Sequence, residues 1–497
     1  MKDKIKECKT NKMSGNEKLL LFIYLGIFFI IATSIACSQA HGNTFPVYTN
    51  PPDEHARYLV PKFIYTYNRI PSGFDEAVRI PMYGNSYAVF NVFPYIIMAL
   101  FMKVAGLFGV GEAGLLIAAR MASVCMGTFM AYFVYKIAGK VFERPEVKWL
   151  FSFAVMFWPQ HLFLHTYVNT DSMAMMSSAI IIYAMLLIYE EGFSFKRSLL
   201  LAVGLTCCLL SYYNAYAFVL YAMILCIAYF YRKNDKAVKN GKAIENGRVL
   251  ENDKELVNND SSKGDSKTGY YYDYKTALKW AGIIIGLILI GTGWWYVHNA
   301  VLYDGDLFGF RINDTLKHTY GAPEIVNYVS IKESGKSIFQ MLFDGDCLYW
   351  YRISFIALFG SMSIYARNYI YLAYTVFIGL GGLLYVIFIP WKNIKMTYRK
   401  AVFHICNLMA ILIPAVLSFY YSYTMDYQPQ GRYLMPMLIP LMYYVVKGYE
   451  KAMVRVVKNE KLTRVLTYVI MAGLMAMMLF MVYHCAFPYY MEYGLVM

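Results

Sequence analysis

The feature that most constrains the fold is a series of long apolar runs that recurs throughout the 497-residue chain. Windows of about 17–25 residues carry almost no charge, and each is long enough to cross a hydrocarbon core of about 30 Å as a helix. The composition agrees, since 59% of the residues are apolar and 16% are charged, against about 45–50% and 25% in soluble domains. These runs exclude a soluble enzyme, a disordered chain and a β-barrel, whose strands alternate over about ten residues. We therefore expect an all-α polytopic membrane protein.

The basic residues are sorted by side. The formal net charge is +14, six lysines precede the first apolar run, and further basic clusters lie in the linkers 390–400 and 447–464. Lys and Arg accumulate in the cytoplasmic loops of membrane proteins. We therefore expect a multi-pass protein of the cell membrane with a cytoplasmic N-terminus, an extracytoplasmic C-terminus and no nucleic-acid partner.

The same charge rule selects the spans. If 92–108 crossed the membrane, the basic turn after residue 138 would lie outside. We therefore expect this short run, which contains Pro94 and Lys103, to lie in the outer interface or to re-enter it. About eleven spans remain, at 19–38, 114–138, 149–168, 172–189, 198–213, 215–231, 277–297, 369–389, 401–422, 433–447 and 465–485.

The linkers between the runs suggest four regions. Residues 232–275 are rich in Asn, Lys, Asp and Gly, which predicts a disordered cytoplasmic insert. The other regions are a basic cytoplasmic N-terminus (1–18), an N-terminal membrane module (19–231) with a large first outer loop (39–113), and a C-terminal membrane module (276–497) with an outer loop (298–368).

The first outer loop contains the run Asn50-Pro51-Pro52-Asp53-Glu54-His55-Ala56-Arg57-Tyr58. Asn favours the N-cap and Pro the first turn, so we predict a short helix that begins at Pro51 and ends near Pro61. Helical spacing pairs Asp53 with Arg57 and turns Glu54 about 100° away. One carboxylate would then act as a base or metal ligand while the other holds the loop. Alternatively, both are capping charges on a solvated helix.

Three further polar positions are predicted to lie on the same face. Asp171, in Asn169-Thr170-Asp171, would either cap the next helix or face a site. Arg432 lies at the start of a predicted span, where the positive end of the helix dipole disfavours a cation. It therefore requires a nearby anion, unless its side chain snorkels to the interface. His298 follows two tryptophans and either belongs to an aromatic belt or joins the chemistry. The few charges within the spans favour surface chemistry over transport.

These motifs resemble those of the GT-C class of integral-membrane glycosyltransferases, in particular the bacterial branch that includes aminoarabinose and protein mannosyl transferases and DUF2142-like membrane proteins. The motifs occur in order along nearly the whole chain. They are Pro52-Asp53-Glu54 with Arg57-Tyr58, Val168-Asn169-Thr170-Asp171, Gly293 to Asn299 followed by Tyr303-Asp304-Gly305-Asp306, Ser354 to Gly360, and Gln430-Gly431-Arg432-Tyr433-Leu434.

The resemblance implies a GT-C-like bundle whose large first outer loop carries short interfacial helices and the catalytic Asp. It implies transfer of a sugar from a polyprenyl-phosphate donor to a hydroxyl of a cell-envelope acceptor (glycan, lipid or protein), with membrane lipid as a further partner. His298 stands where relatives usually have Arg. The implied site residues are Asp53, as general base, and Glu54 for catalysis, Arg432, His298 and Arg57 for the donor phosphate, and Asp171 and Asn169 for the acceptor or a metal.

Two other functions and one cofactor remain open at this point. A flippase or transporter of lipid-linked glycans would need a continuous polar path across the bundle, and a non-catalytic membrane scaffold would need only the fold. Outer carboxylates can bind Mg²⁺ or Mn²⁺, so the sequence leaves a divalent cation as the one cofactor to test.

Overall fold

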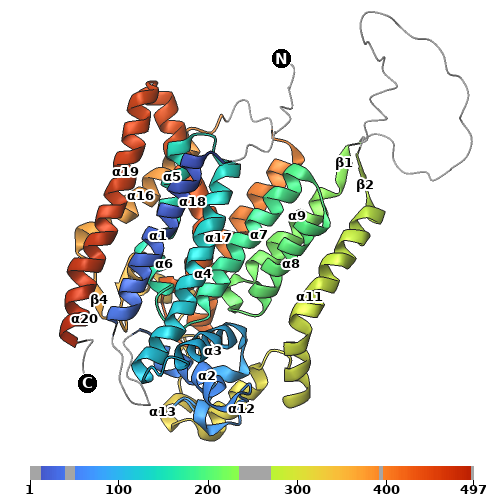
Figure 1. Ribbon diagram of the computed structural model, residues 1–497, viewed down its shortest axis with the longest axis vertical. Coiled ribbons are helices and arrows are strands. Elements are labelled where there is room, and N and C mark those ends of the chain that lie inside the picture. The colour runs from blue at the N-terminus through green and yellow to red at the C-terminus, as the bar shows by residue number, and fades with distance from the viewer. Residues whose placement is uncertain (1–12, 40–50, 234–269, 391–395, 494–497) are drawn as a thin grey trace, which may run out of the picture.

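The computed structural model describes residues 13–39, 51–233, 270–390 and 396–493, which form an elongated helical bundle (Figure 1). Helices account for nearly all regular structure in these residues, and the strands form two small antiparallel pairs. The predicted all-α architecture is thereby confirmed.

The elements of the first half are α1 (Gly15–Ser38), α2 (Glu54–Tyr67), α3 (Phe93–Gly106), α4 (Glu112–Val141), α5 (Pro145–Met156), α6 (Pro159–Leu164), α7 (Asp171–Glu191), α8 (Phe195–Leu209), η3 (Tyr213–Ala215), α9 (Ala217–Tyr229) and β1 (Tyr231–Lys233). Those of the second half are β2 (Tyr270–Tyr272), α11 (Tyr274–Leu302), α12 (Phe310–Tyr320), α13 (Pro323–Val326), α14 (Ile338–Phe343), α15 (Cys347–Ile356), β3 (Leu358–Phe359), β4 (Ile364–Tyr365), α16 (Asn368–Ile387), α17 (Tyr398–Thr424), η5 (Gly431–Met437), α18 (Leu438–Ala452), α19 (Glu460–Phe480) and α20 (Phe487–Tyr493).

Seven described helices are long and apolar enough to cross a membrane, namely α1, α4, α7, α11, α16, α17 and α19 with its extension to Met491. They coincide with seven of the predicted spans. The other four predicted spans fall on shorter helices of the same bundle: α5 and α6, α8, α9, and α18. Among the seven, α7 is the most enclosed, with 72% of its apolar window buried, and α11 is the least, with 17%. Thus α7 lies at the centre of the bundle and α11 at its edge.

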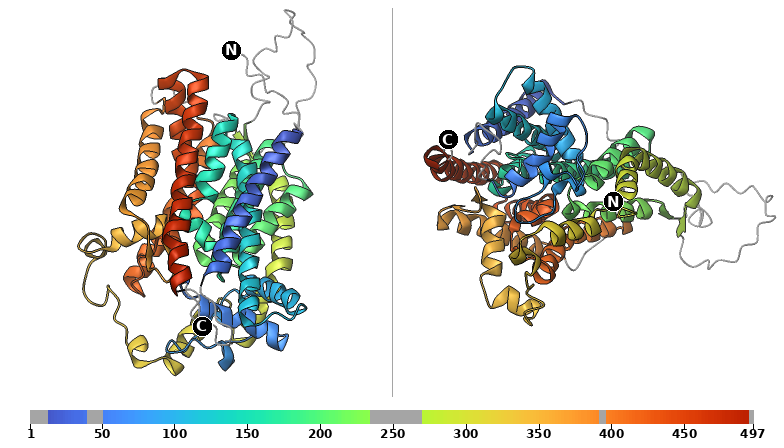
Figure 2. Two further views of the ribbon diagram at one scale, coloured as in Figure 1. Left: turned by 60° about the vertical axis from the view of Figure 1, so that its left-hand side comes forward. Right: turned by 90° about the horizontal axis from the view of Figure 1, so that it is seen from below.

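The two ends of the bundle differ. Helices α2, α3, α12 and α13 gather at one end, which we call the outer end, and the views in Figure 2 agree. Helix α1 begins at the opposite, inner end, whereas α20 ends at the outer end. Helix α3 falls on the run 92–108. Its 14 residues rise only about 21 Å, less than a hydrocarbon core of about 30 Å. Helices α5, α8, α9 and α18 are similarly short, so length alone does not separate α3 from the predicted spans.

The predicted helix in the first outer loop has different limits. Helix α2 begins at Glu54 and continues through Pro61 to Tyr67, so the prediction of a helix from Pro51 to near Pro61 is wrong. Pro61 removes one backbone hydrogen bond, but α2 buries Val60, Phe63 and Ile64 on one face, and this apolar burial offsets the loss. Asn50, the predicted N-cap, lies outside the described residues.

The predicted insert is structured at both of its edges. Strands β1 and β2 pair in antiparallel register with Tyr231 opposite Tyr272, and α11 begins two residues later. The rest of the insert, residues 234–269, lies outside the described residues. The hairpin therefore fixes both ends of the insert at the inner end of the bundle (Figure 1).

Candidate active site

A buried ion pair anchors the first outer loop to the bundle. Arg120 of α4 donates two hydrogen bonds to the Glu54 carboxylate, from Nε to Oε1 at 2.9 Å and from Nη2 to Oε2 at 2.6 Å. Oε1 also accepts the backbone N–H of Val168 at 2.8 Å. Arg120 Nη1 donates to the carbonyls of Ala36 and Gln39. Both charged side chains are 0% exposed, so Glu54 is the residue that holds the loop.

Asp53 is the carboxylate left facing the outside. Its side chain is 42% exposed and its Oδ2 accepts a 2.8 Å hydrogen bond from Arg432 Nη2. The residue has a left-handed backbone, with φ 60°, a conformation that few non-glycine residues adopt except Asp and Asn. This backbone conformation directs the Asp53 side chain away from the buried side chain of Glu54.

The pKa of Asp53 is set by opposing effects. Burial raises it, but the charges of Arg432 and Arg57 and the hydrogen bond from Arg432 outweigh burial, so the net pKa lies below the ordinary Asp value of 3.8. Asp53 is therefore ionised at neutral pH. The predicted ion pair between Asp53 and Arg57 is wrong, because the partner of Asp53 comes from the other end of the chain.

Arg57 instead faces Asp171 from α7. The Nη1 to Oδ2 distance is 3.8 Å, and the same nitrogen donates to Thr170 Oγ1 at 3.2 Å. The guanidinium carbon lies 4.8 Å from the ring centre of Tyr87 and 6.0 Å from that of Tyr212, which places the cation against aromatic faces. Asp171 is the first residue of α7 rather than its N-cap.

The two arginines are buried but not saturated. Within the described residues, the Nε–H groups of Arg57 and Arg432 have no hydrogen-bond partner, and each residue is 5% exposed. Buried guanidinium groups normally use their donors. Unused donors beside an exposed carboxylate are what a site for an anionic or hydroxyl-rich ligand requires.

Arg432 belongs to the short helix η5, beside Asp53. Its Nη2 also donates to the Tyr433 hydroxyl at 3.1 Å, and that hydroxyl donates to Gln428 Oε1 at 2.6 Å. The backbone N–H of Gly431 donates to Ser354 Oγ of α15 at 2.6 Å. The motifs Ser354 to Gly360 and Gln430 to Leu434 thus meet in space.

Gly431 is required because the chain passes very close to α15. Gly431→Ala should lower the free energy of unfolding by about 1–3 kcal/mol, as overpacking does, because an added Cβ would lie 2.3 Å from the backbone nitrogen of Phe355. Thermal unfolding in detergent measures this. Gly26→Ala in α1 is the matched control, since its added Cβ meets no atom within 4 Å. Equal shifts for the two variants would contradict the assignment.

Within the described residues, Asn169 and His298 form no hydrogen bond with the four charged side chains. Asn169 is fully buried and shapes the turn before α7: its Nδ2 donates to the carbonyl of Leu164 at 2.7 Å and its Oδ1 accepts from the Ser172 N–H at 3.0 Å. The ring of His298 stacks on the buried Trp295 with centroids 5.2 Å apart, and its role stays a prediction. The structure therefore brings Asp53, Arg57, Asp171 and Arg432 together and leaves Asn169 and His298 in supporting positions.

The described residues contain no group of three or more His, Cys, Asp or Glu side chains that could hold a metal ion. Asp53 and Asp171 each face an arginine instead. Mg²⁺ is usually held by one or two carboxylates together with waters and substrate phosphates, so a cation at Asp53 or Asp171 would compete with these arginines. The requirement for a cation stays a prediction.

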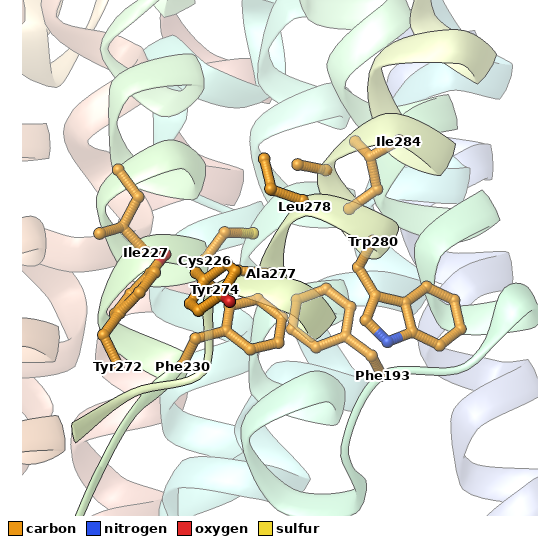
Figure 3. Close-up of a pocket in the computed structure, with 11 residues that line it drawn as sticks. Phe193, Cys226, Ile227, Phe230, Tyr272, Tyr274, Ala277, Leu278, Trp280 and Ile284 are labelled. Carbon is orange, nitrogen blue, oxygen red and sulfur yellow. The ribbon is translucent and has the colours of Figure 1, made fainter. Parts of the chain in front are cut away.

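A pocket of about 250 Å³ lies far from these residues, between α9 and α11 at the inner end (Figures 1 and 3). Figure 3 shows that rings and aliphatic chains form its wall, among them Phe193, Phe230, Trp280 and Ile284. Its lining contains no charged residue. Its polar groups are limited to the Tyr272 and Tyr274 hydroxyls, the Trp280 N–H and the Cys226 thiol, and its lining offers a phosphate no cation.

Sequence reasoning missed Arg120, Tyr87 and Tyr212. Arg120 could have been identified from the sequence, because a lone arginine inside the apolar run 114–138 requires an anion as its partner. The two tyrosines carried none, since 48 tyrosines are spread along the chain.

The fold places the chain among the GT-C-like polytopic membrane folds. ArnT from Cupriavidus metallidurans bound to undecaprenyl phosphate is similar, with a TM-score of 0.51 and 12% identity over 97% of this chain and 69% of that chain. The archaeal oligosaccharyltransferase AglB from Archaeoglobus fulgidus, in complex with an inhibitory peptide and a dolichol-phosphate, has a TM-score of 0.50 and 11% identity over 94% of this chain. The chain spans 56% of the length of AglB. At these identities the likeness shows the fold.

The family model described as "Predicted membrane protein (DUF2142)" matches residues 74–442, and the chain belongs to this family. The match includes Asp171 and Arg432 and begins after Asp53. A comparison with curated proteins finds no match.

Proposed function

We propose that this protein transfers a sugar from a polyprenyl-phosphate donor to an acceptor hydroxyl of the cell envelope, with Asp53 as the general base. The observation that carries the proposal is the pairing of an exposed carboxylate, Asp53, with a buried arginine, Arg432, 2.8 Å away. The fold supports it, because solved relatives of this fold contain undecaprenyl phosphate and dolichol-phosphate. We place the outer end on the extracytoplasmic side of the cell membrane and the N-terminus in the cytoplasm, as the basic residues predict.

The proposed step uses the two groups in complementary ways. The acceptor oxygen attacks the sugar C1 while its proton passes to the Asp53 carboxylate. The bond from C1 to the phosphate oxygen breaks, and its electron pair leaves with the polyprenyl phosphate, whose charge Arg432 stabilises. A positioned base typically contributes a factor of about 10²–10⁴, and guanidinium binds phosphate oxygens with charge-assisted hydrogen bonds.

The ion pair also couples donor binding to base strength. While Arg432 binds Asp53, the lowered pKa makes this carboxylate a weak base. A donor phosphate that engages Arg432 competes with Asp53 for the guanidinium and places a second negative charge nearby, and both effects raise the Asp53 pKa. Donor binding thus prepares the base for the acceptor proton.

The remaining predicted residues take more limited roles. We assign Arg57 and Asp171 to the binding of the donor phosphate and the acceptor, because Arg57 lies near both Asp53 and Asp171 and retains a free Nε–H among the described residues. Glu54 becomes a positioning residue, because Arg120 and Val168 occupy its oxygens. We assign Asn169 to stabilising the turn before α7 and His298 to stabilising the end of α11.

Turnover by the full-length protein in vesicles tests the proposal. Labelled polyprenyl-phosphate sugars and a cell-envelope acceptor fraction are supplied, with and without EDTA, and label is followed in the acceptor and across the bilayer. Label in the acceptor supports transfer, and its loss with EDTA would add a divalent cation to the mechanism. Label that crosses without transfer would make the protein a flippase. If label is neither transferred to the acceptor nor carried across the bilayer, the scaffold alternative remains.

Arg432→Gln should lower kcat/KM for the donor by about 10–150-fold, since a hydrogen bond to a charged group contributes about 1.5–3 kcal/mol. It should also move the acid limb of the pH profile upward. The base acts only when Asp53 is ionised. Loss of Arg432 removes the main effect that lowers the Asp53 pKa, and burial then raises this pKa. Arg352→Gln is the control, because Arg352 is an exposed outer-loop arginine that lies against Tyr349. An unmoved acid limb would contradict the coupling.

A further inference from the structure

A second polar cluster lies at the inner end of the bundle, opposite the candidate active site. It is built where the start of α17 and the ends of α16 and α18 meet. On α17, Lys400, His404 and Asn407 are spaced to share one face. The His404 Nδ1 lies 3.1 Å from the Tyr444 hydroxyl of α18, and the rings of Tyr444 and Tyr385 of α16 are 5.0 Å apart.

Positive charge exceeds negative charge in this cluster. Lys451 of α18 lies 4.0 Å from the ring centre of Tyr385, and Arg455 lies 5.6 Å from that of Phe388. Within the part of the chain that the structure describes, Lys400, Lys451 and Arg455 form no salt bridge within 4 Å, whereas the neighbouring Lys447 is paired with Glu450 at 2.6 Å.

Two observations argue that these cations do more than mark the cytoplasmic side. Asn407 is 3% exposed, and its amide adjoins the Tyr444 hydroxyl, although Nδ2 forms no hydrogen bond within normal distance and angle limits among the described residues. Lys451 is half-buried beside a ring instead of extending into solvent, and burial together with the charges of Lys447 and Arg455 lowers its pKa. A buried donor with a poor partner and a crowded cation are both stabilised by an anion.

The position of the cluster selects the kind of anion. It lies where two predicted spans end, and the adjoining surfaces of α16 and α17 are apolar, with Ile387 55% and Leu408 50% exposed. Basic clusters between helices at the cytoplasmic boundary bind anionic lipid headgroups. An acyl chain can lie along the apolar surface while the phosphate reaches the cations.

We propose that the cluster formed by Lys400, His404, Asn407, Tyr444 and Lys451 binds the phosphate of an anionic phospholipid from the inner leaflet. The site is separate from the candidate active site, so the proposal does not depend on sugar transfer.

Native mass spectrometry of the full-length protein, supplied with phosphatidylglycerol or phosphatidylcholine, tests the proposal. A basic side chain near an anionic lipid surface contributes a factor of roughly five. The double variant Lys400→Gln/Lys451→Gln should therefore lose about 20-fold in its preference for phosphatidylglycerol. The matched control is Lys458→Gln/Lys461→Gln, which removes the same charge from exposed positions of the linker 447–464 and should keep the preference. Thermal unfolding checks that both variants are folded.

Three outcomes would overturn the proposal. The first is equal retention of the two lipids by the unmodified protein. The second is an equal loss in both double variants, which would mean bulk charge without a site. The third is displacement of phosphatidylglycerol by millimolar inorganic phosphate, which would assign the site to a soluble phosphate.

Discussion

Asp53→Asn is expected to reduce turnover of the polyprenyl-phosphate sugar by a factor of about 10²–10⁴, the usual contribution of a positioned general base. The amide cannot take up the acceptor proton, yet the substitution changes little else. Asn adopts the left-handed backbone of Asp53 almost as readily as Asp, and its oxygen can still accept the hydrogen bond from Arg432. The loss should therefore appear in kcat, with a smaller fall in the thermal unfolding midpoint than Glu54→Gln gives, because Arg432 loses its paired charge where Asp53 is 42% exposed.

Asp75→Asn provides the control for this experiment. Asp75 lies on the same outer loop and pairs with Arg69 at 2.5 Å, but its partner is 56% exposed and the pair is at the surface. Its replacement should leave turnover within about twofold, because an exposed pair contributes little. Unchanged turnover in Asp53→Asn would remove Asp53 from the role of base, and an equal loss in both variants would indicate damage to the loop.

Glu54→Gln is expected to destabilise the folded protein by about 3–5 kcal/mol, the cost of leaving one member of a buried ion pair without its partner. Gln can still accept the Val168 N–H, but it leaves the Arg120 charge uncompensated where both side chains are 0% exposed. The first outer loop would also lose its fixed connection to α4. Unfolding in detergent measures the stability, and turnover of the surviving protein reports the position of Asp53.

The control is Glu112→Gln, which removes a carboxylate paired with Lys62 at 2.5 Å, where the two side chains are 25% and 14% exposed. This pair is more exposed than that of Glu54 and Arg120, so we expect a smaller loss than for Glu54→Gln. The double variant Glu54→Leu/Arg120→Met should recover part of the lost stability, because it removes both buried charges. A shift for Glu54→Gln no larger than that for Glu112→Gln would contradict the anchoring role.

The membrane architecture could be predicted from the sequence because it depends on length and charge. A run such as 172–189 becomes the buried helix α7 whatever its neighbours are, since its apolar length alone suits a span. Four predicted spans proved to be shorter helices. In one of them, 149–168, Pro159 begins a separate helix after α5, and a hydropathy window cannot resolve such a break.

The charged residues could be placed on one face, but their partners could not be predicted. Local spacing paired Asp53 with Arg57, whereas folding gave Asp53 to Arg432 and Arg57 to Asp171. Helical spacing describes only neighbours within one helix, and these contacts join different helices and loops. The end of α2 was also set by tertiary packing, because apolar burial carried the helix past Pro61.

The separation between Asp53 and Arg432 has a consequence for biosynthesis. The two residues are 379 positions apart in the chain, and ribosomes add about 5–20 residues per second. Roughly 20–75 s therefore pass between the synthesis of Asp53 and that of Arg432. During this interval Asp53 waits at the membrane surface without its final partner, whereas the partner of Arg57, Asp171, is made much earlier. A chain interrupted before η5 therefore contains most of the bundle but no completed site.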